Sequence, residues 1–140
     1  MTMAIHTNFR TFGLALDKYV MEEVPDLLKG RVTVIALEGT KSLTELTPVD
    51  TGRAKGNWQF TLGTPAGGEV ERLDPSPEGS VGMVAQADVL TSMRSWKPGV
   101  WIWFHNGVPY ITILNDGNEG RPAHMMLERT IEHLTRWIES

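Results

Sequence analysis

The chain has 140 residues, the usual size of a single domain, and 41% of them are hydrophobic, which is enough for one core. Its net charge is −4, whereas proteins that grip nucleic acid usually carry a basic excess. The chain contains no cysteine, which excludes disulfides and thiolate chemistry, and no run of about 18 apolar residues predicts a membrane span.

The first third of the sequence predicts two helices. Apolar residues at spacings of three and four indicate a first helix with a buried stripe formed by Phe9, Phe12, Leu16 and Val20. Pro25 should separate it from a longer helix over residues 26–46, because proline lacks a backbone donor. The buried stripe expected on this second helix comprises Leu28, Val32, Ile35, Gly39, Ser42/Leu43 and Leu46. Gly39 favours the close approach of another backbone.

A turn follows at Pro48, which cannot continue the helix. Asp50 is a candidate N-cap for a short helical turn over residues 51–57. Beyond it the apolar period changes to two, with Trp58, Phe60 and Leu62 on one face of a predicted strand.

Three further segments favour strands, at residues 81–87, 100–104 and 109–114, with a short helix over residues 88–96. Residues 63–80 hold four glycines, three prolines and four acidic residues, so we expect a mobile hairpin loop too polar for the core. The sequence thus predicts an antiparallel sheet of about four strands.

A C-terminal helix is predicted to open at Arg121-Pro122 and to pack on the sheet. Its expected buried stripe comprises Met126, Leu127, Ile131, Leu134 and Ile138. The fold expected from these elements is a single α+β domain over residues 1–140.

Motifs for catalysis are missing from the sequence: it holds no phosphate-binding loop, nucleophile elbow or zinc-binding helix motif. His124 and Glu128 have the spacing of two metal ligands on a helix, but this pair of common residues is more typical of a solvated face. We therefore expect no enzyme activity, no metal and no cofactor.

Tryptophan and basic residues remain as candidates for binding. Trp101 and Trp103 share one face of a predicted strand, and could be core, a protein interface or a platform for sugar rings. Arg53 and Lys55 near Trp58 could meet an acidic partner or DNA phosphates, although a solvated helix start is the simpler interpretation.

Two blocks of the sequence resemble a known family. The first is Leu46-Thr47-Pro48-Val49-Asp50-Thr51-Gly52-Arg53-Ala54-Lys55-Gly56-Asn57-Trp58, and the second runs from Trp96-Lys97-Pro98-Gly99 through Trp101 and Trp103 to Asn106-Gly107-Val108-Pro109-Tyr110. Both are similar to segments of the tail-completion proteins of long-tailed bacteriophages, which complete the tail or join it to the head. The likeness covers residues 16–138 in order, and departs from the family pattern at Asn115-Asp116-Gly117.

The resemblance implies a non-enzymatic virion protein of the tail and neck, present in the host cytoplasm during assembly. Its copies would form a ring that contacts tail-tube or head-connector subunits, with DNA only passing through the lumen and no membrane involved. We expect six charged residues to be exposed, and we assign them to partner contacts: Arg53, Lys55, Glu69, Glu71, Asp116 and Glu119. The alternative is a small ligand-binding module, for carbohydrate among other ligands, that uses the Trp101/Trp103 face.

Overall fold

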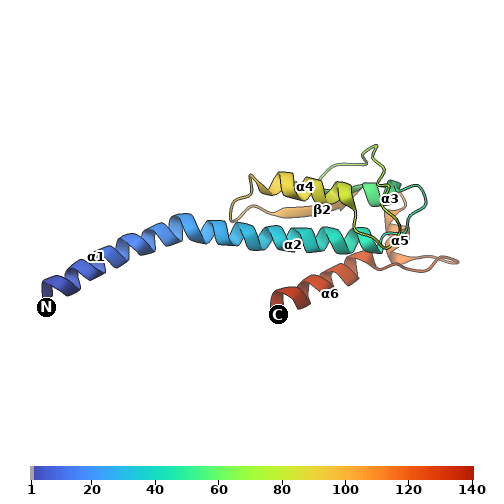
Figure 1. Cartoon of the computed structure of the whole chain (residues 1–140). Helices are drawn as coiled ribbons and strands as arrows, with labels where there is room; N and C mark the ends of the chain where they lie inside the picture. Colours follow the sequence, from blue (N-terminus) through green and yellow to red (C-terminus); the bar gives the residue numbers. More distant parts are fainter. Residues whose placement is uncertain (1) are drawn as a thin grey trace.

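The computed structural model describes the backbone of residues 2–140 and the side chains of residues 10–140. Figure 1 shows a body of helices and a small sheet, from which the N-terminal half of a long helix projects. The elements are α1 (Thr2–Lys18), a π-helical turn η1 (Tyr19–Glu23), α2 (Val24–Leu46), α3 (Arg53–Gly56), β1 (Trp58–Leu62), α4 (Met83–Met93), β2 (Ile102–Asn106), α5 (Ile111–Asp116) and α6 (Met126–Glu139). The fold is therefore mixed helix and sheet.

The two predicted N-terminal helices form one continuous helix, because η1 joins α1 to α2. In η1 the backbone N–H of Val24 bonds to the carbonyl of Tyr19, one residue farther back than in an α-helix. Pro25 follows at the start of α2, and it lacks the backbone N–H that would continue the ladder of hydrogen bonds. The wider turn thus absorbs the proline without breaking the helix.

The buried face of α2 differs from the predicted stripe. The residues buried on α2 are Ala36, Gly39, Thr40, Leu43 and Thr44, whereas Leu28 is 44% exposed and Ile35 is only half-buried. Gly39 is needed for close approach, but the neighbour is a ring: a Cβ there would lie 2.9 Å from Cζ of Phe104. The helical period was predicted correctly, and so was the burial of Gly39 and Leu43, but the buried face is rotated from the predicted stripe toward Ala36, Thr40 and Thr44.

The sheet has two antiparallel strands, with Phe60 opposite Phe104 and Trp58 opposite Asn106. The strand predicted at residues 81–87 is wrong, since this segment lies mostly in α4, whose buried face is Ala85, Val89 and Met93. These residues recur every four positions, and the short apolar run imitated a strand. The strand predicted at 109–114 is also wrong, because α5 occupies it.

The C-terminal helix begins at Met126 and not at Arg121-Pro122. Its start is set from outside, since the backbone N–H of Leu127 donates to the side-chain oxygen of Asn115 in α5 (3.0 Å). The expectation that this helix packs on the sheet is wrong: α6 lies along α2 (Figure 1).

The seam between α2 and α6 is antiparallel. Three pairs of side chains meet across it, and residue numbers rise along α2 as they fall along α6. The pairs are Arg31 with the Trp137 ring, Glu38 with His133, and Ser42 with Thr130. The row Arg31, Glu38 and Ser42 also includes Ile35 by helical spacing, which explains why Ile35 avoids the main core.

Two apolar clusters hold the body together. One joins α2, α4 and the sheet through Ala36, Phe60, Val89, Met93 and Trp96. The other joins α2, β1, α4 and α6 through Leu43, Trp58, Ala85 and Met126, with Ile111 and Leu114 of α5 packed against it. These clusters hold the surrounding elements in place, whereas the main contacts of the described part of α1 are with η1, the turn that follows it.

Candidate functional site

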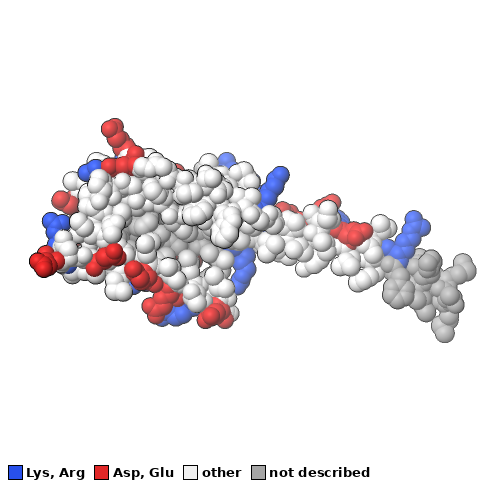
Figure 2. Space-filling model, turned by 180° about the vertical axis from the view of Figure 1, so that it is seen from behind, with Lys and Arg blue, Asp and Glu red and all other residues white. Residues whose placement is uncertain are grey.

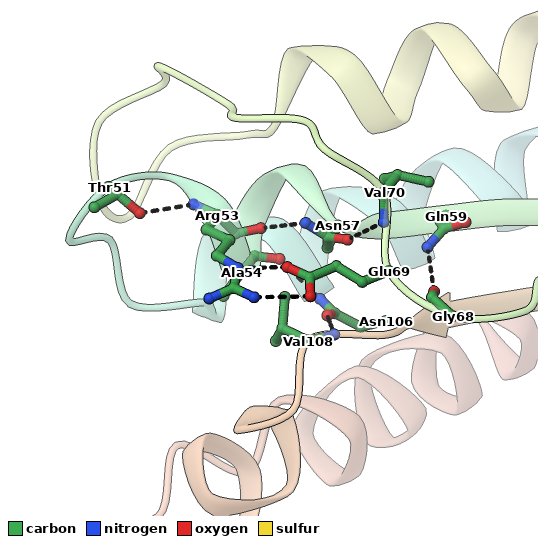
Figure 3. A network of polar contacts seen from close by, with 10 residues as sticks. All are labelled: Thr51, Arg53, Ala54, Asn57, Gln59, Gly68, Glu69, Val70, Asn106 and Val108. Atoms are coloured by element: carbon green, nitrogen blue, oxygen red, sulfur yellow. Dashed lines mark hydrogen bonds and ion pairs between the residues drawn. The ribbon is translucent and has the colours of Figure 1, made fainter.

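The two motif blocks that were singled out in the sequence meet in space (Figure 3). The side-chain amide of Asn106 donates to the carbonyl oxygen of Ala54 (2.8 Å), and its oxygen accepts from the backbone N–H of Val108 (3.2 Å). The guanidinium of Arg53 lies 5.5 Å from the ring centroid of Tyr110. Much of the motif therefore builds the turn between α2 and the sheet.

Trp58 anchors this turn to the end of α2. Its indole N–H donates to the hydroxyl of Thr47 (2.8 Å), which in turn donates to the carbonyl of Leu43 (2.6 Å). Both side chains are buried. The tryptophan of the motif is thus a structural residue, and its polar atom is satisfied inside the body.

Gly52 occupies a position that only glycine can adopt without strain. Its φ angle is +83°, and a Cβ there would lie 2.2 Å from the carbonyl oxygen of Asp74. The helical turn α3 starts directly after it, so Asp50, which is exposed, is not the N-cap that we predicted. The hydroxyl of Thr51 accepts from the backbone N–H of Arg53 in its place (3.3 Å).

Arg53 and Glu69, both candidate contact residues, pair with each other. Two guanidinium nitrogens of Arg53 donate to the two carboxylate oxygens of Glu69, one of them at 2.8 Å. The hydrogen bond from Arg53 lowers the pKa of Glu69. The pair lies at the surface, where a partner can reach it, and it ties residues 63–80 to α3 (Figure 3).

Lys55 is fully buried, so its assignment as an exposed contact residue is wrong. Its ammonium donates to the carbonyl oxygens of Pro77 (2.8 Å) and Ser80 (2.7 Å). Burial lowers the pKa of Lys55, and the nearby carboxylate of Asp74 partly offsets that effect. Lys55 holds the long loop against the body from inside.

We expected residues 63–80 to be too polar for the interior, and Asp74 shows that this expectation is wrong. Its side chain is buried and accepts hydrogen bonds from the backbone and hydroxyl of Ser76. Burial acts to raise the pKa of Asp74, but these bonds, the backbone N–H of Val84 and the charge of Lys55 outweigh it, and the pKa is lowered. The segment has no regular secondary structure and is nevertheless anchored.

Glu71, Asp116 and Glu119 are exposed, as a contact role requires. Asp116 accepts a hydrogen bond from the side chain of Asn115 (2.9 Å). His124 lies before α6 begins, so it does not share a helical face with Glu128. Among the described residues, no group of three or more His, Cys, Asp or Glu side chains is arranged to hold a metal ion.

A cavity of about 580 Å³ lies between the motif turn and α5. Arg53 and Arg121 line it together with Asp50 and Glu78, so charges of both signs face the space. Tyr110 adds an aromatic edge. The cavity therefore suits a protein side chain or loop as well as it suits a small ion.

Trp101 and Trp103 lie on the open face of the sheet. Trp101 is 73% exposed, and the two ring centroids are 6.4 Å apart with a tilt of 38°. The indole N–H of Trp103 donates to the carbonyl of Gly63 (2.9 Å), which fixes that ring. Of the three interpretations that the sequence left open, burial in the core is excluded for Trp101.

The largest candidate surface is the part of the helix that projects from the body, residues 10–30, which we call the arm. Figure 2 shows the described part of it standing clear of the body, with charged side chains of both signs along its length. Its large apolar side chains are 44–76% exposed: Phe12, Leu14, Leu16, Tyr19, Val20, Met21, Leu27 and Leu28. The stripe assigned to the core here is exposed, and the side chain of Phe9 lies outside the described residues.

A second exposed apolar row lies on α6. Leu127, Ile131 and Ile138 are 46%, 64% and 52% exposed, although the sequence assigned them to the core. The buried row of α6 contains Met126 and Thr130, each one residue earlier and so about 100° around the helix axis.

One clue to the exposure of the arm was present in the sequence. Leu14 and Met21 stand opposite Phe12 and Leu16 on the helix, whereas a helix with a single buried stripe carries its apolar residues on one side.

Comparisons with protein-family models, curated proteins and solved structures found no match. In the part of the chain that the structure describes, none of the helices is long and apolar enough to cross a membrane.

Proposed function

We propose that this chain is a non-enzymatic structural protein of a long-tailed bacteriophage. It would complete the head-proximal end of the tail and join it to the head connector as part of a ring. The proposal starts from the resemblance of residues 46–58 and 96–110 to phage tail-completion proteins. In the structure these two blocks pack together into one turn, which is the behaviour of a shared structural motif.

The observation that carries the proposal is the arm. Monomeric proteins seldom expose long apolar surfaces unless a partner covers them. The arm exposes apolar side chains on opposite sides, with Phe12 and Leu16 on one and Met21 on the other, so more than one neighbour is needed to bury it. A subunit that joins tail to head meets neighbouring copies in the ring as well as tail or connector subunits, so different partners can cover different sides of the arm.

The experiment that tests the proposal is complementation of a phage that lacks the gene. We expect wild-type protein to restore joined particles, and a variant without residues 2–23 to leave separate heads and tails, counted by electron microscopy. The circular dichroism melt of the truncated protein serves as the folding control. Normal joining by the truncated protein would contradict the role given to the arm.

A second candidate function is ligand binding by the open sheet face. The exposure of Trp101 beside the fixed ring of Trp103 favours it, because exposed aromatic rings stack on sugar rings and on other flat groups. This function predicts that Trp101→Ala abolishes binding on a glycan array and leaves particle assembly unchanged. If Trp101→Ala prevents the joining of heads and tails and the wild type binds no glycan, the indole of Trp101 belongs to a protein contact.

A further inference from the structure

We propose that the arm of one subunit docks on the exposed apolar row of α6 in a second copy of this chain. The docked row of the arm comprises Phe12, Leu16, Tyr19 and Val20, and the receiving row comprises Leu127, Ile131 and Ile138. The inference rests on the assembly role proposed above and specifies the contact that builds the ring.

The arm is large enough for a specific interface. Its eight exposed apolar side chains offer roughly 900 Å², if a large side chain contributes about 200 Å² when fully exposed. A standard protein interface buries about 800 Å² on each partner. The docked row supplies roughly 400 Å² of this apolar surface, at about 200 Å² for each fully exposed side chain. That is about half of a standard interface, and the polar side chains beside the row would supply the remainder, because interfaces have a polar rim around an apolar centre.

The partner of the arm cannot be α6 of the same subunit. The arm is continuous with α2 through η1, and α6 runs antiparallel to α2 so that Trp137, near its end, reaches only Arg31. From that level the arm extends away from α6 by about 30 Å, at 1.5 Å per residue over residues 10–30. The separation of the two ends in Figure 1 agrees with this geometry, so a contact requires a second copy.

The exposed row of α6 fits the arm in form and chemistry. On the arm, Phe12, Leu16 and Tyr19 are four and three residues apart. On α6, Leu127, Ile131 and Ile138 are four and seven residues apart, so each set lies along one face of its helix and can interlock as a ridge with the other. On α6, the exposed row lies next to the residues that face α2. A docked arm would therefore form a third helix beside the α2–α6 pair.

The pairing also has the symmetry that a ring needs. Arm and α6 are different surfaces of the same chain, so each subunit gives its arm to one neighbour and receives the arm of another. Such a head-to-tail contact closes into a ring when the rotation between subunits permits it. A contact between two identical arms would instead stop at a dimer.

Cross-linking tests the pairing directly, because the chain has no cysteine of its own. The double variant Val20→Cys/Ile131→Cys, treated with a short bis-maleimide, should give a ladder of covalent oligomers, and each single variant should remain monomeric. Glu71→Cys combined with Val20→Cys is the matched control. Dimers formed by Val20→Cys alone would show an arm–arm contact and overturn the proposal, as would the lack of a ladder from the double variant.

A second measurement keeps folding and docking apart. Ile131→Asp should weaken self-association measured by analytical ultracentrifugation at least about tenfold, whereas Arg129→Gln should not, because Arg129 is exposed about 160° around the helix axis from Ile131 and the change alters the net charge by the same amount. Both should melt like the wild type, and equal association of the two variants would overturn the docking surface. Phage complementation is scored separately. If the wild type restores joined particles but the cysteine double variant gives no ladder, this contact is refuted and the assembly role stands. If the double variant gives a ladder but Ile131→Asp joins heads and tails normally, the assembly role is refuted and the contact stands.

Discussion

The body and the arm use similar apolar side chains in opposite ways. In the body, Leu43 and Trp58 meet side chains from helices and strand, and both are buried. In the arm, Leu16 and Tyr19 follow the same helical period and are about 45% and 44% exposed. An apolar helical stripe therefore shows that a surface needs a partner, and it does not show whether that partner belongs to the same chain.

The polar residues sharpen this difference. The body buries Lys55, Asp74 and Asn57, each with hydrogen-bond partners from elsewhere in the chain. Across the described residues, no buried side-chain nitrogen or oxygen lacks a partner. Changes in the body should thus alter stability, whereas changes in the arm should alter association.

The largest effect is expected from Lys55→Glu. The new carboxylate would face the carbonyl oxygens of Pro77 and Ser80, and it would add a like charge near Asp74. We expect a loss of about 3–5 kcal/mol in the free energy of unfolding, measured by urea denaturation. Glu71→Lys, an exposed charge reversal in the same loop, is the control and should change stability by less than about 0.5 kcal/mol. Equal stability of the two variants would contradict the burial of Lys55.

Gly52→Ala comes next. The added Cβ would meet the carbonyl oxygen of Asp74 and would hold alanine at φ +83°. A loss of about 2–3 kcal/mol is expected from the strain and the forced shift of the loop, and a lower melting temperature would report it. Gly63→Ala isolates the strain alone, since Gly63 also has a positive φ but open space around it. A smaller loss at Gly52 than at Gly63 would refute the contact with Asp74.

The effect of Asp74→Asn should depend on pH. Because the folded state lowers the pKa of Asp74, its carboxylate stabilises the fold above the pKa of the unfolded chain, and that stability disappears as the pH falls through the folded pKa. We expect the wild type to exceed the variant by about 1–2 kcal/mol in the free energy of unfolding at pH 7, and the difference to shrink as the pH falls below about 4, the ordinary pKa of an aspartate. Urea denaturation at several pH values measures this, and a constant difference would show that Asp74 does not titrate as a charged group.

The smallest effect on stability is expected in the arm. Val20→Ser removes an apolar side chain that is 52% exposed and touches no core cluster, so the melting temperature of dilute protein should be unchanged. The same variant should reduce self-association at high concentration, measured by analytical ultracentrifugation. A destabilisation comparable with that of Gly52→Ala would mean that the arm belongs to the fold of the monomer, and would end the contrast between the two regions.

Limited proteolysis adds a test within the body. The composition of residues 63–80 predicted mobility, whereas Lys55, Asp74 and the Arg53–Glu69 pair anchor this segment. With its anchors intact the segment should resist trypsin at Arg72, whose guanidinium bonds to Asp88 and to the carbonyls of Gly56 and Trp58. First cleavage at Arg72 in the folded protein would favour the mobility that the composition predicts.

Local features of this fold could be predicted from the sequence, because they depend on neighbouring residues. The helical period of residues 26–46, the break at Pro48 and the strand over Trp58, Phe60 and Leu62 follow from backbone sterics and side-chain alternation. The sequence did not predict that the two motif blocks meet, since nothing in the residues themselves links Ala54 to Asn106.

Only the tertiary structure decided which face of each element is covered. Lys55 is buried because carbonyls 22 and 25 residues farther along the chain surround its ammonium, and α6 begins at Met126 because Asn115 receives the N–H of Leu127. Periodicity gives the spacing of apolar residues but not the direction from which a partner approaches. For this reason the stripe on the arm and the row Leu127, Ile131 and Ile138 on α6 were assigned to the core, although the described side chains of both are exposed in the monomer.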